Sequence, residues 1–290
     1  MILTVFLSAA LAQEAPPIVN GSNTQDFKAV GALTIKQQND YYSFCSGTLI
    51  HPEYVLTAAH CVEAAESYDR QGARVNFTVG HNVGNDNAIE ESIRVVDYEI
   101  HPQYNDQGGR IQHDIGILVL NKAVSEAQPM AVNDDRLKPS WSDVILDYVG
   151  FGITGDNRQD SGRKRTAQIA IYDWDDQYIY GYDSVSNLCS GDSGGAAIRV
   201  FEDGSMALAG VNSFVFSVQG SNPCDGGASG ATRVDSHMDW IEDLVPLEEL
   251  ENLPEEEEPE PEQGGNNEGE VGEGGFSSLP ARPGSDVTAI

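Results

Sequence analysis

Residues 44–50 read Phe-Cys-Ser-Gly-Thr-Leu-Ile, and residues 54–56 read Tyr-Val-Leu. Runs this short are typical of β-strands, because helices in globular proteins need longer periodic segments. The pattern extends outward from Ala29–Ile35 to Ile115–Leu120, with turn segments rich in Asn, Asp and Gly between the runs. It resumes at Val144–Val149 after a connection that contains Pro and Asp. The sequence therefore predicts an all-β sandwich or barrel.

Helical spacing is confined to two places. Ala58–Glu66 has the length and composition of one brief helix. Near the end of the β pattern, Met238, Ile241 and Leu244 recur at helical spacing, and Asp235 or Ser236 could cap the N-terminus of a helix. We expect one amphipathic helix over residues 235–245 that closes the fold.

The chain of 290 residues carries a formal net charge of −30. Residues 246–290 hold 13 acidic residues and one basic residue, a charge of −12, which leaves −18 for residues 1–245. Such a charge excludes nucleic acid and anionic lipid as expected partners. It is compatible with high salt or with cationic partners, but we favour solubility as its role.

Both ends differ in composition from the middle. Residues 1–12 are apolar and end in Ala-Leu-Ala, which indicates a secretory signal; a buried N-terminal strand is the alternative. Residues 246–290 are rich in Glu, Pro and Gly, and residues 264–275 have almost no apolar residues, which predicts an acidic disordered tail. The globular part then covers about residues 18–245.

The sequence has four cysteines, Cys45, Cys61, Cys189 and Cys224. Four cysteines allow three pairings, and a secreted chain is expected to form two disulfides. No Cys-x-x-Cys motif occurs, so the spacing does not favour a zinc site.

Residues 191–195 read Gly-Asp-Ser-Gly-Gly and place Ser193 among glycines. A serine hydroxyl attacks a carbonyl only if a base takes its proton and donors receive the resulting negative charge. His60 follows a short strand and precedes Cys61, which a disulfide would hold in place. Asp114 enters a strongly apolar strand, where an imidazole N–H would satisfy its carboxylate.

These three motifs, in the order His, Asp, Ser, resemble those of the chymotrypsin-like (trypsin family) serine endopeptidases over roughly residues 18–245. The resemblance implies an all-β fold of two packed six-stranded antiparallel barrels, about residues 18–127 and 128–233, with a C-terminal helix over 235–245. It also implies a monomer that acts on protein or peptide substrates, and with the N-terminal signal we expect it to be secreted and extracellular. Some relatives bind calcium in a loop that here begins at His81, where a carboxylate ligand would be wanted, so we expect no metal and no cofactor. A catalytically inactive binding or regulatory homologue is the alternative.

The resemblance assigns a role to each motif. Ser193 would be the nucleophile, His60 the general base and then acid, and Asp114 the group that orients His60. The backbone N–H groups of Gly191 and Ser193 would form the oxyanion hole. The family's disulfides would join Cys45 to Cys61 and Cys189 to Cys224.

Activation in this family frees an α-amine that pairs with the aspartate before the nucleophile. Here Ile18 and Asp192 stand in those positions, and residues 13–17 would be a short pro-segment. Relatives usually carry Arg or Lys before the Ile, whereas this chain has Pro17. The protease that activates it is therefore not expected to be trypsin-like, or the leader is trimmed in another way.

The substrate pocket is assigned by the same resemblance. Members that cut after Arg or Lys have Asp where this chain has Asn187, and members that cut after large residues have Gly where it has Val215. We therefore expect cleavage after small or medium apolar residues. The other positions expected to contact substrate are Leu188, Ser213, Phe214 and Ser229.

Overall fold

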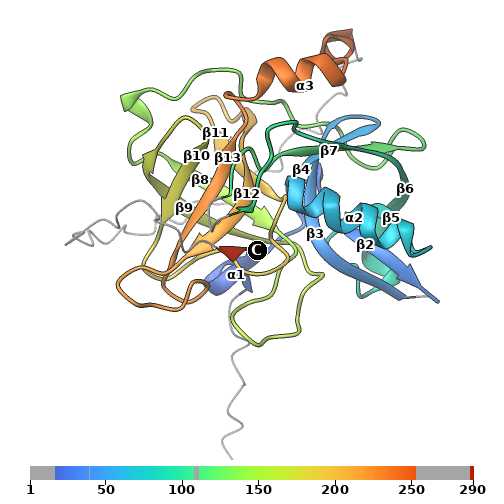
Figure 1. The fold of residues 1–290 in the computed structure, drawn as a ribbon, viewed down its shortest axis with the longest axis horizontal. Coiled ribbons are helices and arrows are strands. Elements are labelled where there is room, and N and C mark those ends of the chain that lie inside the picture. Colours follow the sequence, from blue (N-terminus) through green and yellow to red (C-terminus); the bar gives the residue numbers. More distant parts are fainter. Residues whose placement is uncertain (1–16, 39, 108–110, 253–287) are drawn as a thin grey trace, which may run out of the picture.

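The structure, a computed structural model, describes residues 17–38, 40–107, 111–252 and 288–290. The predicted signal at residues 1–12, residues 13–16 of the predicted pro-segment and most of the predicted tail lie outside these residues. Two six-stranded antiparallel barrels lie side by side, as Figure 1 shows. The predicted fold class is therefore confirmed. Within the described residues, no helix is long and apolar enough to cross a membrane.

The first barrel closes in the order β2-β3-β4-β7-β6-β5. Some of its strands bury every second residue and others bury a continuous run, and the core between them contains Leu33, Leu56 and Phe77. The strands are β2 (Val30–Gln37), β3 (Asp40–His51), β4 (Tyr54–Thr57), β5 (Arg74–Gly80), β6 (Ile89–Ile100) and β7 (Gly116–Leu120). The opening stretch of the sequence thus forms most of β3 and the start of β4, which pair with each other.

The second barrel is a ring because β8 pairs with both β9 and β11 in the order β8-β9-β10-β13-β12-β11. Two short strands extend it: β1 (Ser22–Asn23) pairs with β9, and β14 (Thr288–Ala289) pairs with β12. The ring strands are β8 (Ile145–Gly150), β9 (Arg165–Trp174), β10 (Tyr178–Tyr182), β11 (Ala196–Val200), β12 (Met206–Phe216) and β13 (Ala228–Arg233). Residues 22–23 therefore lie with the second barrel, not with the first as the predicted boundary at residue 18 implied.

Strand β13 lacks the apolar alternation that identifies strands in sequence. It reads Ala-Ser-Gly-Ala-Thr-Arg, yet all six residues are buried. Small residues are needed there because a Cβ at Gly230 would collide with the ring of Phe214. Close packing therefore overrides the usual strand composition.

Two helices of some length cover the barrels. The helix α2 (Ala59–Arg70) runs longer than the predicted Ala58–Glu66, and α3 (Met238–Leu244) begins three residues later than predicted. The remaining short elements are α1 (Pro17–Asn20), η1 (Asp86–Ala88), η3 (Pro139–Trp141) and η4 (Leu247–Asn252). The sequence favoured disorder over residues 246–290, and η4 and β14 depart from that expectation.

Both disulfides predicted by resemblance are confirmed. Cys45 of β3 is bonded to Cys61 of α2, across 16 residues. Cys189 is bonded to Cys224, across 35 residues. The first bond ties the start of α2 to the first barrel, and the second joins the loop before β11 to the loop before β13.

Replacing Cys45 and Cys61 together by Ala should lower the free energy of unfolding by about 3 kcal/mol, because a loop of this length loses its closure constraint in the unfolded chain. Urea unfolding followed by fluorescence measures the change. The exposed substitution Glu202→Ala serves as the control and should leave the midpoint unchanged. An unchanged midpoint in the double variant would contradict the role given to this bond.

Candidate active site

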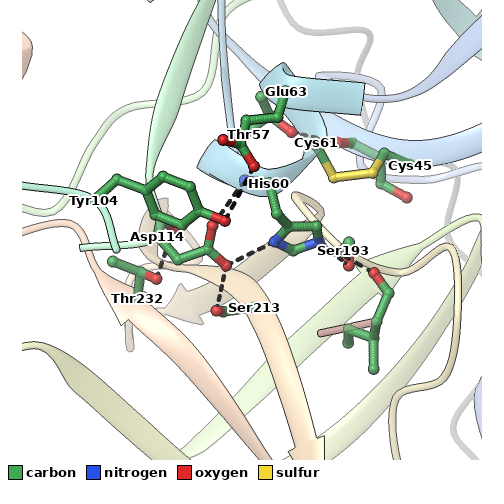
Figure 2. Close-up of polar contacts among 12 residues, drawn as sticks. Cys45, Thr57, His60, Cys61, Glu63, Tyr104, Asp114, Ser193, Ser213 and Thr232 are labelled. Atoms are coloured by element: carbon green, nitrogen blue, oxygen red, sulfur yellow. Dashed lines mark hydrogen bonds and ion pairs between the residues drawn. A yellow bond between two sulfur atoms is a disulfide. The ribbon is translucent and has the colours of Figure 1, made fainter. Parts of the chain in front are cut away.

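The side chains of Asp114, His60 and Ser193 form one hydrogen-bonded chain, shown in Figure 2. The Nδ1 atom of His60 lies 2.8 Å from an Asp114 carboxylate oxygen. The Nε2 atom of His60 lies 2.7 Å from the Ser193 hydroxyl oxygen. Both distances are those of good hydrogen bonds, so the imidazole joins the carboxylate to the hydroxyl.

Different elements position the three side chains. His60 is in the first turn of α2, beside the Cys45–Cys61 disulfide. Asp114 comes just before β7 of the first barrel, whereas Ser193 comes just before β11 of the second. The chain of hydrogen bonds therefore crosses the junction between the two barrels.

Asp114 is fully buried but well supplied with donors. Its carboxylate accepts hydrogen bonds from the backbone N–H of His60, at 3.0 Å, and from the hydroxyl of Ser213 on β12. The hydroxyl of Thr232 on β13 donates to the backbone carbonyl of Asp114 at 2.8 Å. A buried carboxylate is stable only when it is hydrogen-bonded in this way.

The pKa values of the pair move in opposite directions. Burial alone would raise the pKa of Asp114, but the charge and hydrogen bond of His60, with the donors named above, bring it below its usual value. Burial alone would lower the pKa of His60, but Asp114 and, to a smaller extent, the carbonyl of Ile290 raise it above its usual value. Asp114 thus stabilises the cationic form of His60.

The backbone before Asp114 is strained. His113 has a positive φ of 48°, a conformation that non-glycine residues rarely adopt. Its N–H donates to the side-chain oxygen of Gln177, and its Nδ1 lies 3.1 Å from Nε2 of His237. These contacts hold the segment that delivers Asp114, although the sequence assigned His113 no role.

His101 completes a group of three histidines with His113 and His237, whose ring nitrogens lie within 4.8 Å of one another. Burial, and then repulsion from the other two rings, lowers the pKa of His101 to about 4. Neutral imidazoles are possible metal donors, but His113 and His237 already bond each other and His237 also bonds the carbonyl of Arg233. The group therefore packs as a hydrogen-bonded cluster against Trp240.

The loop that carries Ser193 is bound to the first barrel through Ser46. The N–H of Ser46 donates to the carbonyl of Ser193 at 2.7 Å, and its hydroxyl donates to the carbonyl of Gly191 at 2.9 Å. Gly191 has a φ of 95°, which residues with a Cβ rarely adopt. Among the described residues, the N–H groups of Gly191 and Ser193 have no acceptor, so both are free to bind an oxygen.

Asp192 points away from Ser193 into the protein and is fully buried. Its carboxylate accepts the N–H groups of Gly152, at 2.8 Å, and Cys189, at 3.0 Å. A Cβ at Gly152 would lie 2.6 Å from the Asp192 carboxyl carbon, so glycine makes room for this side chain. Burial raises the pKa of Asp192 to about 7, although these donors and the charge of Arg165 oppose the shift.

The segment around Ile18 lies close to the loop of the second disulfide. Ile18 is completely buried, and Val19 packs with Cys189 and Cys224. The N–H of Asn187 donates to the carbonyl of Val19 at 3.2 Å. The residues expected to form an activation pair thus belong to one region of the second barrel.

The residues expected to contact substrate are all nearly inaccessible to solvent. Asn187 donates a side-chain N–H to the carbonyl of Pro223 at 2.8 Å. Leu188 and Val215 belong to one buried apolar cluster. Val215 of β12 pairs with Ser229 of β13, and Phe214 lies beside them on β12. The structure therefore gathers these residues around the end of β12.

One contact at the site involves a residue that the sequence placed in the tail. The carbonyl oxygen of Ile290 lies 3.3 Å from Nε2 of His60. Nothing in the local composition of residues 288–290 indicates this contact. It depends on long-range packing alone.

The comparisons with known proteins agree with this geometry. The family model described as Trypsin matches residues 18–241. The chain is 29% identical over 265 residues to CLIP domain-containing serine protease B10 of Anopheles gambiae, covering 78% of this chain and 69% of the relative. It is 26% identical to chymotrypsin-like elastase family member 1 of Macaca fascicularis, and the match covers 79% of this chain and 95% of the relative. It is also 28% identical to brachyurin of Leptuca pugilator, covering 70% and 88%.

The raised pKa of Asp192 predicts a pH effect on stability while Ile18 is still joined to Pro17. Between about pH 4 and pH 7 the folded chain keeps a proton that the unfolded chain releases, so Asp192 stabilises the fold less as pH rises. To measure the contribution of Asp192, the free energy of unfolding is compared between the variant Ser193→Ala and the double variant Ser193→Ala/Asp192→Asn. The excess stability of the single variant over the double variant should fall as the pH rises from 5 to 8. Urea unfolding at each pH measures it.

The exposed substitution Asp203→Asn, in the same background, is the matched control, because its effect should be constant over this pH range. A difference for Asp192→Asn that stays constant or rises with pH would contradict the raised pKa.

Proposed function

Because the chain belongs to the trypsin family of serine endopeptidases, we propose that it hydrolyses peptide bonds through Ser193, His60 and Asp114. The observation that carries this assignment is the continuous chain of hydrogen bonds from the Asp114 carboxylate through His60 to the Ser193 hydroxyl. Ser193 offers a hydroxyl that can attack a carbonyl, His60 a base that can take its proton, and Asp114 a carboxylate that can hold the imidazole in place.

In the proposed reaction, His60 takes the proton of the Ser193 hydroxyl while the serine oxygen attacks the peptide carbonyl. The resulting imidazolium is stabilised by the buried carboxylate of Asp114, whose pKa lies below its usual value. His60 then gives the proton to the leaving amine. In the second half of the reaction His60 takes a proton from water as the water oxygen attacks the acyl-enzyme, and returns it to the Ser193 oxygen as the ester bond breaks.

The free N–H groups of Gly191 and Ser193 are the proposed donors to the oxyanion that forms during attack. The link from Ser46 to the Gly191 and Ser193 carbonyls supports this role, since preorganised donors stabilise charge best. Loss of one such donor typically costs about 100- to 1,000-fold in rate.

We propose cleavage after small or medium apolar residues. Asn187 is uncharged and its side-chain N–H is already bonded to Pro223, so it offers no carboxylate to an Arg or Lys side chain. Leu188 and Val215 provide apolar surface instead. The relatives named as elastases are consistent with this proposal.

We propose that cleavage between Pro17 and Ile18 activates the enzyme. Ile18 has a φ of 38°, which strains a β-branched residue as long as the preceding peptide bond is intact. A buried carboxylate with a pKa raised to about 7 lacks full charge compensation, and the freed α-amine of Ile18 would supply it at Asp192.

Secretion and a monomeric state belong to the same proposal. The two disulfides support secretion, because such bonds form and persist in oxidising compartments. The same proposal divides the chain into a signal at residues 1–12, a pro-segment at 13–17, a protease domain at 18–245 and a tail at 246–290. The signal and the pro-segment would be removed by cleavage.

A fluorophosphonate should label the activated protein stoichiometrically at Ser193. Ser193→Ala should abolish labelling, because within the described part of the chain Ser193 carries the hydroxyl that is bonded to His60. His60→Ala should lower peptide hydrolysis by about 10⁶-fold. Intact mass and peptide mapping identify the labelled residue. A mature wild-type protein that takes up no label would indicate the inactive homologue instead.

A panel of peptide amides that differ only before the cut should show kcat/KM at least about tenfold higher for Ala, Val or Ile than for Lys, Arg or Phe. Val215→Gly should raise kcat/KM for Phe about tenfold, because it removes the side chain that narrows the pocket. Val200→Gly, an exposed site, is the matched control. A dominant preference for Lys or Arg would refute this interpretation of Asn187.

A further inference from the structure

We propose that residues 288–290 of this chain bind in its own substrate groove, so that the enzyme is self-inhibited with Ile290 in the primary specificity pocket. The proposal rests on the proposed function, since the groove is the one that would hold the substrate. Its evidence comes from backbone pairing, a contact with His60 and the burial of one side chain.

The backbone evidence is an added strand. β14 pairs with β12 in antiparallel register, with Ala289 opposite Phe214 and Thr288 opposite Val215. The N–H of Ile290 donates to the carbonyl of Ser213 at 3.3 Å. Figure 1 shows this short red strand beside β12, at the C-terminal mark. Peptide ligands commonly bind by adding a strand to a free sheet edge.

The edge that β14 occupies is the one left open at this end of β12. β13 pairs with β12 through Phe216, so it takes the opposite edge at Phe214 and Val215. On the other side, the pairing with β11 ends at Val211. A substrate backbone needs the same unpaired groups of β12 and cannot use them while β14 is present.

The contact with His60 places Ile290 at the reacting end of the groove. The Ile290 carbonyl oxygen is 3.3 Å from Nε2 of His60, the atom that also lies 2.7 Å from the Ser193 hydroxyl. The carbonyl carbon of a substrate must reach the Ser193 hydroxyl, beside this same nitrogen, to be attacked. Ile290 therefore blocks the approach to Ser193 directly.

The side chains alternate as a bound strand requires. Ala289 is exposed, whereas Ile290 is only 7% exposed and belongs to the apolar cluster that contains Leu188 and Val215. A branched aliphatic side chain therefore fits beside the residues proposed to set specificity. The acidic tail and acidic body repel each other, so backbone pairing and apolar burial, rather than charge, hold the segment.

The covalent connection makes a short segment effective. About 40 residues join α3 to β14, and a tether gives its end a local concentration on the order of 1 mM or less. A segment with a Kd about tenfold below that concentration occupies the groove in roughly nine molecules of ten. Apparent KM for a peptide substrate would then rise about tenfold, with kcat unchanged.

The test compares activated full-length protein with Ile290→Asp, which places a charge in the apolar pocket, and with a form lacking residues 288–290. Ala289→Asp is the matched control, because it adds the same charge at an exposed neighbouring side chain. Fluorophosphonate titration gives the active-site concentration of each form. KM and kcat are then measured with a small peptide amide ending in Val or Ile.

Ile290→Asp and the shortened form should each lower KM about tenfold at constant kcat, and Ala289→Asp should match the wild type. The synthetic peptide Asp-Val-Thr-Ala-Ile should inhibit the shortened form competitively. Wild-type KM should not change with enzyme concentration over a 100-fold range; inhibition that grows with concentration would show binding to a second copy and overturn the proposal.

Equal KM values in all forms would also overturn it, while leaving the protease assignment intact. A failure of the proposed function looks different. In that case none of the forms, shortened or not, reacts with the fluorophosphonate, and the catalytic assignment fails together with the inference that depends on it.

Discussion

The burial of one charged carboxylate, that of Asp114, connects the two barrels of this protein. A carboxylate removed from water is tolerated only with hydrogen-bond donors and a nearby positive partner. Asp114 belongs to the first barrel, and so does His60, but the Ser213 hydroxyl that donates to its carboxylate comes from the second. The Thr232 hydroxyl, also from the second barrel, donates to the backbone carbonyl of Asp114. The barrels must therefore meet in one arrangement for this charge to be satisfied. That arrangement also delivers Ser193 to His60.

In a second buried carboxylate, that of Asp192, the effect of burial on the pKa outweighs the effect of the neighbouring donors and charges. Two backbone N–H groups and the nearby charge of Arg165 do not offset its burial, and its pKa rises to about 7. Asp114 has a pKa below its usual value, because the imidazole of His60 lies 2.8 Å away. Two aspartates of equal burial thus differ through their partners. Asp192, which has no ion pair among the described residues, lies one residue from the proposed nucleophile, where a change of its charge would reach the proposed oxyanion donors.

The free edge of β12 is a further consequence of how the second barrel closes. β11 leaves β12 at Val211, so the groups of Ser213 to Val215 on that side are available to a peptide. An open sheet edge pairs readily with any extended segment that reaches it. In this chain the segment that reaches it is residues 288–290. The sheet edge proposed to bind the backbone of a substrate is equally open to the protein's own backbone.

The sequence by itself determined the all-β class and the helix near residue 240, and it singled out Ser193, His60 and Asp114 as candidate site residues, because these depend on local patterns and short motifs. It did not identify β13, whose small residues are dictated by the ring of Phe214 packed against Gly230. Nor did it indicate the strained His113 with Gln177 and His237, or the contact of Ile290 with His60. Each of these joins residues far apart in the chain, so only tertiary packing decided them.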